Sequence, residues 1–355
     1  MRRDGPVRLL VVVGSPLYRA RLSKALARFD VTAVPGASNT TEARDSILAH
    51  HPDVILLDLE LVRGDALNFL RKLRDHYPVP VFALTRPGGN RGTAALQAVE
   101  LGALEVLARP DDRDGPVFQA FVADVAERLR QAAAHARPVP LPRVVRRLPP
   151  ASWRAAGLDP ARYLVAIGAS TGGTEAIRAV LTAVPPDFPP VVIVQHMPVG
   201  FTRSFAERLD AYSPLRVTEA VDGEVVTVGR AVVARGDTHL EVRRAENGWR
   251  VRYTHQTPVN NHCPAVDVLF ESVAQAARTA GVGLLLTGMG RDGARGMAAI
   301  RAQGGLTLAQ NQASCVVYGM PKAAVDLGAV EETGEPAVLP VLTLRHLRER
   351  LASAV

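Results

Sequence analysis

Short apolar runs alternate with amphipathic segments through the first 135 residues, and this alternation constrains the fold more than any other feature of the sequence. Five runs have the length and composition of buried strands: Val7–Val13, Val31–Val34, Val54–Leu57, Val81–Leu84 and Leu104–Leu107. Segments with helical spacing separate them, near residues 18–29, 41–50, 65–76 and 94–101, and a last amphipathic helix is predicted over 116–134. Such an order forms a parallel sheet with helices on both faces. The sequence therefore predicts an α/β domain over residues 1–135.

A proline-rich stretch follows over residues 136–158. It contains five prolines: Pro138, Pro140, Pro142, Pro149 and Pro150. Because proline cannot continue a helix and favours extended spacers, we interpret the stretch as an interdomain linker. Several arginines are concentrated in the same stretch. They favour a solvated linker, and docking of an acidic partner is the alternative.

The α/β pattern resumes over residues 159–352. Strands are predicted at Tyr163–Ile167, Val191–Val194, Val282–Leu286 and Thr307–Gln310, with helices near 175–184, 202–210, 266–277 and 294–302. Residues 215–256 instead show short alternating runs and an Asn247–Gly248 hairpin signal, which are typical of antiparallel strands. We predict a doubly wound α/β domain with an antiparallel hairpin section.

Composition excludes several classes of protein. Hydrophobic residues make up 47% and charged residues 22% of the 355 residues, which is a globular balance. No apolar run approaches the roughly 18 to 20 residues that cross a bilayer, so we expect no direct membrane insertion. The net charge is +7, but only three of the 42 basic residues are lysines and the arginines are scattered, so we expect no nucleic acid partner. The two cysteines, Cys263 and Cys315, indicate a reducing cytosol.

Three polar residues of the second domain each follow a predicted strand. Ser170 lies in a glycine-rich turn before a helix, His196 follows the next strand, and Asp292 follows the strand at 282–286. The carboxyl ends of parallel strands line the crevice where ligands bind. A serine nucleophile, an imidazole base and a carboxylate that fixes the imidazole tautomer are the parts of an acyl-transfer site. The turn is expected to expose the hydroxyl, and the helix N-terminus and the backbone near Met289 and Gly290 are the candidate oxyanion donors.

Each piece also has a plainer interpretation. A glycine-rich strand–helix turn is more often a phosphate or dinucleotide cradle, and Ser170 or Asp292 can simply cap a helix. No Walker lysine, full G-x-G-x-x-G spacing or ribose-binding carboxylate accompanies the turn. His239, His255 and His262 lack metal spacing, so we assign no metal, and Cys315 is expected in the core. The pattern alone leaves catalytic and structural roles open.

Longer motifs resemble the catalytic domain of the chemotaxis protein-glutamate methylesterases. They cover most of residues 160–330: Gly168–Ile177, Gln195–Pro198, Gly200–Arg208, Pro264–Phe270, Thr287–Gly293 and Ala309–Pro321. The resemblance implies that Ser170 is the nucleophile, His196 the base and Asp292 its orienting carboxylate. It further implies that Met289 donates a backbone amide to the oxyanion hole and that Thr171 belongs to the site.

The implied activity is hydrolysis of glutamate γ-methyl esters on methyl-accepting chemoreceptors in sensory adaptation. Methanol is released, some family members also deamidate receptor glutamines, and no cofactor is needed. The implied partners are the cytoplasmic helices of chemoreceptors and a chemotaxis histidine kinase, which places the protein in the cytoplasm. Two rival functions remain: a catalytically idle signalling adaptor that only binds partners, and a serine hydrolase for another protein substrate.

The first domain resembles a response-regulator receiver, with a flavodoxin-like parallel sheet. Asp58 matches the phospho-acceptor, Thr85 the switch hydroxyl, and Arg109 stands where a lysine is expected. A receiver also needs an acidic pair after its first strand to hold Mg²⁺, and this chain has Val13 and Gly14 there. We therefore expect lost or weak Mg²⁺ binding, poor or no phosphorylation of Asp58, and a docking or inhibitory role for a degenerate receiver.

Overall fold

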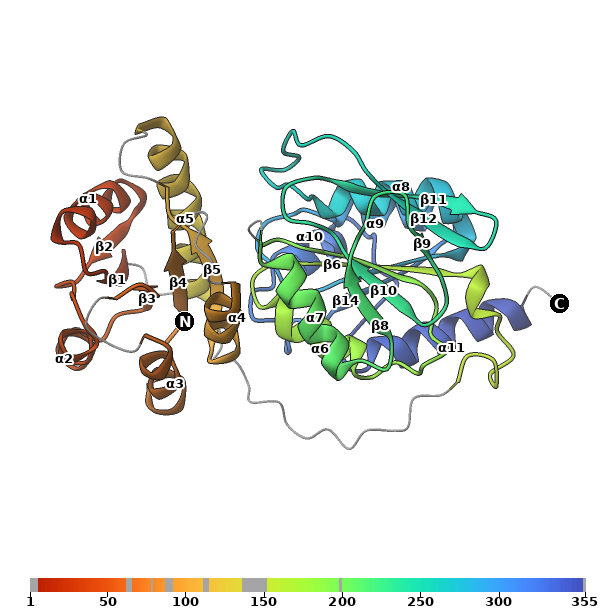
Figure 1. Ribbon diagram of the computed structural model, residues 1–355, viewed down its shortest axis with the longest axis horizontal. Helices are drawn as coiled ribbons and strands as arrows, with labels where there is room; N and C mark the ends of the chain where they lie inside the picture. Colours follow the sequence, from red (N-terminus) through yellow and green to blue (C-terminus); the bar gives the residue numbers. More distant parts are fainter. Residues whose placement is uncertain are drawn as a thin grey trace. The chain divides into compact units, whose positions relative to one another are not determined.

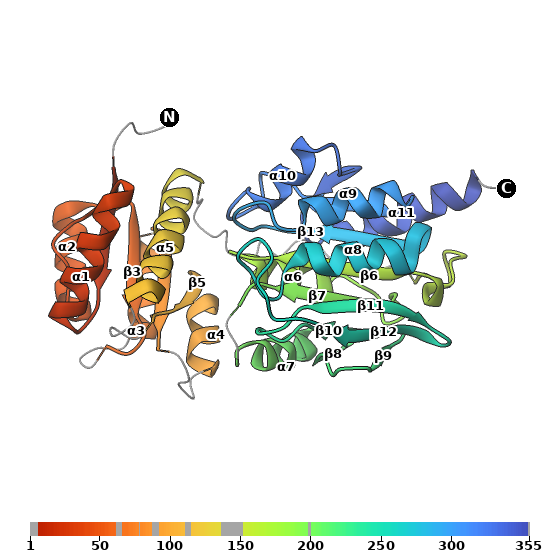
Figure 2. The same ribbon diagram turned by 90° about the horizontal axis from the view of Figure 1, so that it is seen from above.

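The computed structural model describes residues 6–61, 66–77, 79–86, 92–110, 115–135, 152–197 and 200–353. The chain divides into two compact units, Met1–Leu141 and Pro142–Val355. Figure 1 labels the elements of both units, and Figure 2 shows them from above. Within the described ranges, no helix is both long enough and apolar enough to span a membrane.

The first unit is built on a five-stranded parallel sheet. Its strands are β1 (Val7–Val12), β2 (Val31–Ala33), β3 (Val54–Asp58), β4 (Val81–Thr85) and β5 (Ala103–Ala108). They lie in the order β2-β1-β3-β4-β5, which is the flavodoxin-like order. The expected receiver-type sheet is thereby confirmed. Strands β3 and β4 are buried throughout, as expected for a sheet covered on both faces.

Five helices accompany this sheet: α1 (Pro16–Leu26), α2 (Thr40–His50), α3 (Ala66–His76), α4 (Gly92–Glu100) and α5 (Gly115–His135). A short 3₁₀ turn, Ala27–Phe29, extends α1. Local sequence sets their starts: Asn39, for example, accepts the N–H groups of Thr41 and Glu42 and so caps α2. Helices α1 and α5 pack together (Figure 1). The expected start of the third helix at Asp65 lies outside the described residues.

The second unit contains a seven-stranded parallel sheet. Its strands are β6 (Leu164–Ala169), β7 (Val191–Gln195), β8 (Arg216–Glu219), β10 (Arg230–Val233), β13 (Gly281–Leu285), β14 (Leu306–Gln310) and β15 (Glu332–Gly334). The order is β15-β14-β13-β6-β7-β10-β8. From β6 the chain first adds β7, β8 and β10 on one side of the sheet. It later adds β13, β14 and β15 on the other side. The resulting switch point lies at β6, and this is where open α/β sheets bind ligands.

Helices cover both faces of the large sheet. They are α6 (Gly173–Leu181), α7 (Thr202–Tyr212), α8 (Val266–Ala277), α9 (Ala294–Ala302), α10 (Met320–Asp326) and α11 (Leu339–Ala352), with 3₁₀ turns at Pro160–Arg162 and Arg278–Ala280. Helices α8 and α9 pack closely on each other, whereas α6 and α7 lie together on the opposite face (Figure 1). Between the sheet and α8, apolar side chains such as Val192, Leu269 and Phe270 form a fully buried core.

The segment 215–256 differs in part from the prediction. An antiparallel sheet is present, made of β9 (Val225–Val226), β11 (Leu240–Ala245) and β12 (Gly248–Tyr253). The β11–β12 hairpin confirms the hairpin section, although its turn lies at 246–247, one residue before the Asn-Gly signal. Strands β8 and β10 were wrongly expected to be antiparallel. They join the large sheet in parallel, because β10 pairs with β7.

The predicted linker lies mostly outside the described residues, and its last part belongs to the second unit. Trp153 is 1% exposed and packs edge-on against Tyr163 and Phe188. Ser152 Oγ donates a hydrogen bond to Asp187 Oδ2 at 2.6 Å. Residues 152–158 therefore pack on the second unit, because a buried indole holds them there. The sequence pattern instead predicts these residues as part of the linker.

Candidate active site

Ser170 follows β6 at the switch point. The backbone N–H of Ser170 donates to Thr287 O at 3.0 Å, which ties the turn after β6 to the loop after β13. Gly172 begins the helical turn with a φ of +77°, a conformation that favours glycine. A Cβ atom there would also lie 2.6 Å from Val316. The glycine-rich sequence is thus required by the turn that positions the serine.

The turn that carries Ser170 is more enclosed than its glycine-rich sequence predicts. Ser170 is 3% and Thr171 2% exposed. The reason is the close approach of the loop that follows β13: a Cβ atom on Gly288 would lie 2.9 Å from Ser170 Cβ. Thr287 Oγ1 donates to Thr171 O at 3.0 Å in the same contact. Only a glycine at position 288 lets the two loops meet.

His196 lies beside Ser170 because their strands are neighbours. Ala169 is paired with Gln195 in the β6–β7 register, and His196 N donates to Ala169 O at 3.1 Å. The buried Gln195 side chain adds a cross-strand contact, since its Nε2 donates to Ser170 O at 2.9 Å. The backbone of the serine is therefore fixed to the strand that carries the histidine.

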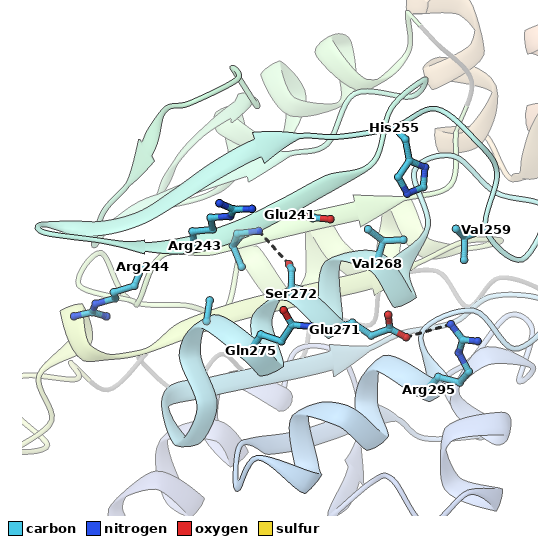
Figure 3. Close-up of a pocket in the computed structure, with 12 residues that line it drawn as sticks. Glu241, Arg243, Arg244, His255, Val259, Val268, Glu271, Ser272, Gln275 and Arg295 are labelled. Atoms are coloured by element: carbon cyan, nitrogen blue, oxygen red, sulfur yellow. Dashed lines mark hydrogen bonds and ion pairs between the residues drawn. The ribbon is translucent and has the colours of Figure 1, made fainter.

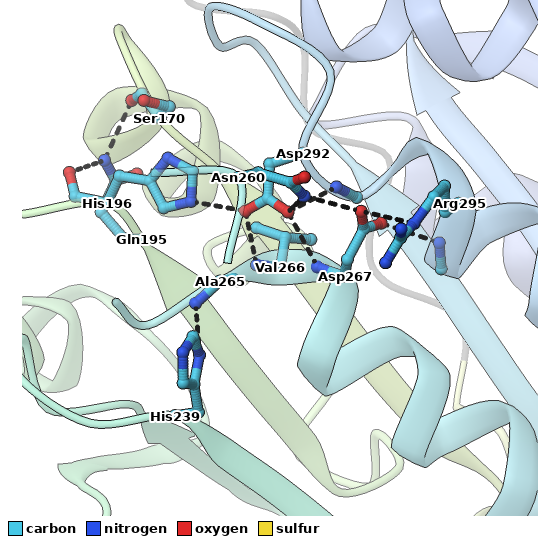
Figure 4. A network of polar contacts seen from close by, with 12 residues as sticks. Ser170, Gln195, His196, His239, Asn260, Ala265, Val266, Asp267, Asp292 and Arg295 are labelled. Carbon is cyan, nitrogen blue, oxygen red and sulfur yellow. Dashed lines mark hydrogen bonds and ion pairs between the residues drawn. The ribbon is translucent and has the colours of Figure 1, made fainter. Parts of the chain in front are cut away.

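The His196 imidazole is hydrogen-bonded to Asp292. Its Nε2 lies 2.9 Å from Asp292 Oδ2, although the residues are 96 positions apart (Figure 4). A carboxylate acceptor requires Nε2 to carry the proton, so Nδ1 presents a lone pair. Among the described residues, the buried Nδ1 has no hydrogen-bond partner. Figure 4 shows Ser170 on the side of the ring away from Asp292. The free acceptor is thus available to a serine proton.

Asp292 is held in its ionised form by an unusual number of donors. Burial raises the pKa of this carboxyl, but the hydrogen bond and charge of His196 and the donors from Val266 and Asn260 outweigh burial, so the pKa lies well below its usual range. Five donors reach its two oxygens: His196 Nε2, Asn260 Nδ2 and the backbone N–H groups of Val266, Asp267 and Gly293. A permanently charged carboxylate can stabilise an imidazolium.

The expected oxyanion donors lie on the loop that contacts the serine. Gly290 has a φ of +80°, and the N–H of Gly288 is used by Val317 O at 3.1 Å. Within the part of the chain that the structure describes, the N–H groups of Met289 and Gly290 have no hydrogen-bond partner. Backbone donors on the loop that contacts the serine turn are suited to an oxyanion hole.

Sequence reasoning gave no role in this region to Asn260 or Asp267, and it considered His262 only as a metal ligand. Asn260 donates to Asp292 and to Asp267, and His262 stacks on His196 with ring centroids 3.7 Å apart. Asp267 is 1% exposed, and burial, with the charge of Asp292, raises the pKa of its carboxyl. The Asn-Asn pair at 260–261 was a turn signal that could have marked this loop.

Other polar candidates are structural. His239 Nδ1 accepts the N–H of Ala265 at 3.0 Å and its Nε2 donates to Thr257 O, so it fixes the chain before α8. Burial raises the pKa of the Cys315 thiol to about 12, which keeps it protonated and unreactive. In the described ranges, no three His, Cys, Asp or Glu side chains gather as metal ligands.

In the first unit, Asp58 ends β3 with an arginine beside it. Arg109 Nη1 lies 3.4 Å from Asp58 Oδ2, and the Arg109 guanidinium also covers the ring of Tyr18 at 5.0 Å. Asp58 Oδ1 accepts the N–H of Glu60 at 2.9 Å. Burial raises the pKa of Asp58, and the backbone N–H of Glu60 and the charge of Arg109 only partly offset it. Thr85 ends the neighbouring strand β4 and is 4% exposed.

The residues around Asp58 do not fit a magnesium ion. Mg²⁺ requires oxygen ligands in near-octahedral geometry. The β1–β3 register places Val13 and Gly14 beside the end of β3, and neither side chain has an oxygen. Glu60 is paired with Arg86 at 3.1 Å. Among the described residues, the group that faces the Asp58 carboxylate is therefore the Arg109 guanidinium, which repels a metal ion.

A polar groove of about 490 Å³ lies between β11 and α8 (Figure 3). Arg295 lines one end, where it pairs with Glu271 at 3.2 Å and approaches Asp267 Oδ2 at 3.5 Å. The described residues that line the groove include neither Ser170 nor His196. The groove therefore adjoins the polar network around Asp292 without containing the expected nucleophile or base.

Fold and site together define a class of protein: a receiver-type α/β sheet joined to a doubly wound unit that carries the serine, histidine and aspartate typical of serine hydrolases. Comparison with protein families agrees, because the response regulator receiver domain matches residues 9–115 and CheB methylesterase matches residues 165–341. The chain belongs to the protein-glutamate methylesterase/protein-glutamine glutaminase family.

Individual relatives support this assignment along the whole chain. A protein-glutamate methylesterase/protein-glutamine glutaminase 2 of Pseudomonas aeruginosa is 45% identical over 99% of this chain and 96% of its own length. The corresponding protein of Salmonella choleraesuis is 44% identical over 92% of this chain and 93% of its own length. The crystal structure of the Thermotoga maritima CheB methylesterase catalytic domain is 36% identical, with a TM-score of 0.50, and covers 52% of this chain and 97% of that one.

Proposed function

We propose that the chain is a serine esterase that hydrolyses glutamate γ-methyl esters of methyl-accepting chemoreceptors and deamidates receptor glutamines. The hydrogen bond from His196 to Asp292 carries this proposal, because it leaves a buried Nδ1, without a partner among the described residues, on the side of Ser170. The names of the curated relatives support the reaction type. We propose action in the cytoplasm, on the cytoplasmic helices of receptors and in a pathway with a histidine kinase.

The geometry suggests a two-stage reaction. Ser170 Oγ attacks the γ-carbonyl carbon while His196 Nδ1 takes its proton, and the negative oxygen is met by backbone N–H groups at Met289 and Gly290. The C–O bond then breaks, and the proton moves from His196 to the leaving methoxide, which departs as methanol. Water then attacks the acyl carbon while the same nitrogen takes its proton. The C–O bond to Ser170 breaks, the proton returns from His196 to Ser170 Oγ, and the receptor side chain is left as glutamate. With glutamine the leaving group is ammonia.

Asp292 stays charged throughout this cycle. The imidazolium that forms on His196 carries a positive charge next to Asp292 Oδ2, so the ion pair is strongest in the transition state. No step needs a metal or cofactor, since the proton transfers and the oxyanion contacts are supplied by the chain. We also assign Thr171 to the site, and the hydrogen bond from Thr287 Oγ1 to its carbonyl supports this by tying the serine turn to the loop after β13.

The test is methanol release from a methylated chemoreceptor cytoplasmic fragment, with Ser170→Ala as the control. We expect the wild type to release methanol and the variant to lose at least about 10³-fold in rate. Binding without release by the wild type would instead support an idle adaptor. Labelling of Ser170 by a fluorophosphonate, without methanol release, would support a serine hydrolase for another protein.

For the first unit, we propose a receiver that holds no Mg²⁺ and whose Asp58 is phosphorylated poorly or not at all. Supporting this, the neighbouring positions carry Val13 and Gly14, and Arg109 is paired with Asp58. Such a unit serves as a docking or inhibitory element. Incubation with an acyl phosphate and Mg²⁺ tests the proposal, and ready, stoichiometric modification of Asp58 would refute it.

A further inference from the structure

Helices α8 and α9 both begin beside the Asp292 carboxylate. An aspartate at the start of each helix accepts backbone N–H groups of the other helix. Asp292 precedes α9, yet its oxygens accept the N–H groups of Val266 and Asp267 at the start of α8, at 2.7 and 3.1 Å. Asp267 lies in α8, yet its Oδ1 accepts the N–H of Gly296 in α9 at 2.8 Å. This reciprocal capping places two buried carboxylates side by side at two positive helix ends.

A single side-chain amide bridges these carboxylates. Asn260 Nδ2 lies 2.9 Å from Asp292 Oδ1 and 2.8 Å from Asp267 Oδ2 (Figure 4). An amide nitrogen has two protons, so it can donate to both oxygens at once. The bridge comes from a tight turn closed by hydrogen bonds between Val259 and His262, with left-handed backbone at Asn260 and Asn261.

The bridge has a direct consequence for the base. Two neighbouring carboxylates repel each other, and without a shared donor one of them would turn away or take up a proton. With Asn260 on Oδ1, the Asp292 carboxylate is held so that Oδ2 faces His196 Nε2. The same turn also carries His262, whose ring lies parallel to that of His196 within 14°. One turn therefore contacts both the Asp292 carboxylate and the His196 imidazole.

We propose that Asn260 is a positioning residue of the catalytic carboxylate: its amide couples Asp292 to Asp267 and so fixes the orientation of the His196 imidazole. Asn260 acts through Asp292 and has no role as a nucleophile, base or oxyanion donor. The proposal rests on the esterase function proposed above, because the imidazole needs a fixed orientation only if it moves a proton.

The turn offers a matched pair of variants. Asn260→Gly and Asn261→Gly both suit left-handed backbone, with φ of 53° and 65°, but only the first removes the bridge. We expect Asn260→Gly to lower kcat by about ten- to hundredfold, as for small misplacements of reacting groups, with little change in KM. Asn261→Gly should retain the wild-type rate. Equal losses in both variants would overturn the proposal.

Asn260→Asp gives a readout that a purely structural role would not change. A protonated aspartic acid can donate one hydrogen bond, whereas an ionised one adds a third negative charge. The groups that face this position are Asp292, Asp267 of α8, Arg295 of α9, and the imidazoles of His196 and His262. We expect kcat/KM of the variant, relative to wild type, to rise as the pH falls from about 8 to 5. A constant or falling ratio would contradict the proposal.

The same variants are compared in labelling of Ser170 by a fluorophosphonate, which needs the activated serine and no receptor. If the wild type is labelled but releases no methanol, the receptor esterase function fails. The Asn260 proposal then stands or falls on the labelling rates. If Asn260→Gly is labelled as fast as the wild type, the positioning role is refuted whatever the substrate.

Discussion

Asp58 in the first unit and Asp292 in the second are both buried aspartates at the carboxyl edge of a parallel sheet, and they are 3% and 1% exposed. Their carboxyl groups nevertheless shift in opposite directions, since the pKa of Asp58 is raised and that of Asp292 is lowered. Burial pushes both pKa values upward. The difference must therefore come from what surrounds each carboxylate.

The surroundings differ in the number of donors. Asp292 receives five hydrogen bonds, three of them from backbone N–H groups at α8 and before α9. The described neighbours of Asp58 supply one backbone N–H, from Glu60, and a guanidinium at 3.4 Å. A sheet edge thus brings an aspartate to a functional position, but helix ends and side-chain amides decide whether it is charged.

The largest expected effect comes from removing the charge of Asp292, which tests whether the two aspartates differ in function. Asp292→Asn places an amide next to His196 and removes the negative charge that stabilises the imidazolium, so we expect kcat to fall by about 10³- to 10⁴-fold. Methanol release from methylated receptor measures this loss. The same change at the other site, Asp58→Asn, should leave the rate close to wild type. Comparable losses from both substitutions would show that the first unit takes part in the chemistry.

A glycine in each unit gives the next largest effect. A Cβ atom on Gly288 would lie 2.2 Å from Met320 Sδ and 2.9 Å from Ser170 Cβ, whereas one on Gly14 would meet nothing within 4 Å. We expect Gly288→Ala to displace the serine turn and lower kcat about 10²-fold. Gly14→Ala should change neither activity nor thermal unfolding. An unaffected Gly288→Ala enzyme would mean that the loop contact does not position Ser170.

Local sequence predicted the elements of this fold better than their pairing. Helices α8 and α9 were expected at the residues where they occur, because apolar spacing and the flanking glycine and proline residues are local signals. Strands β8 and β10 have equally clear strand sequences, but their parallel pairing depends on β7, which is distant in the chain. Helices α10 and α11 and strand β15 were not predicted. Pairing depends on long-range contacts that no short window contains.

Only part of the candidate site could be predicted from the sequence. His196 and Asp292 could be brought together from the rule that strand ends share an edge, although the sequence could not give the 2.9 Å contact or which nitrogen makes it. The bridge from Asn260 was not predictable. It depends on a left-handed turn that aims a side chain at carboxylates 7 and 32 positions away.

A third test adds the carboxylate oxygens that a Mg²⁺ site beside Asp58 would need. Val13→Asp with Gly14→Asp and Arg109→Lys adds two carboxylates beside Asp58 and replaces the guanidinium with a smaller ammonium. We expect this variant to gain Mg²⁺-dependent labelling of Asp58 by an acyl phosphate, because Mg²⁺ needs several oxygen ligands. The wild type should show no dependence on Mg²⁺. Equal Mg²⁺ dependence of labelling in both chains would show that neither the missing oxygens nor Arg109 prevents the ion from binding.

The smallest effect concerns the pH dependence of stability at Asp58. Because its folded pKa is raised above the unfolded value of about 3.9, the folded state holds the proton more tightly than the unfolded chain. Wild-type stability therefore falls as the pH rises through the window between these two pKa values. Asp58→Asn lacks this proton, so its free energy of unfolding relative to wild type should rise with pH above about 4 and then level off.

Asp292 should give the opposite slope, which makes the pair a test of the donor argument. Its folded pKa is lowered, so its contribution to stability is complete above the unfolded pKa and is lost as the pH falls. Both tryptophans, Trp153 and Trp249, are buried in the second unit, so fluorescence follows that unit in the full chain. Hydrogen exchange of β3 amides follows the first unit. Slopes of the same sign at Asp58 and Asp292 would show that burial alone, and not the count of donors, governs these carboxylates.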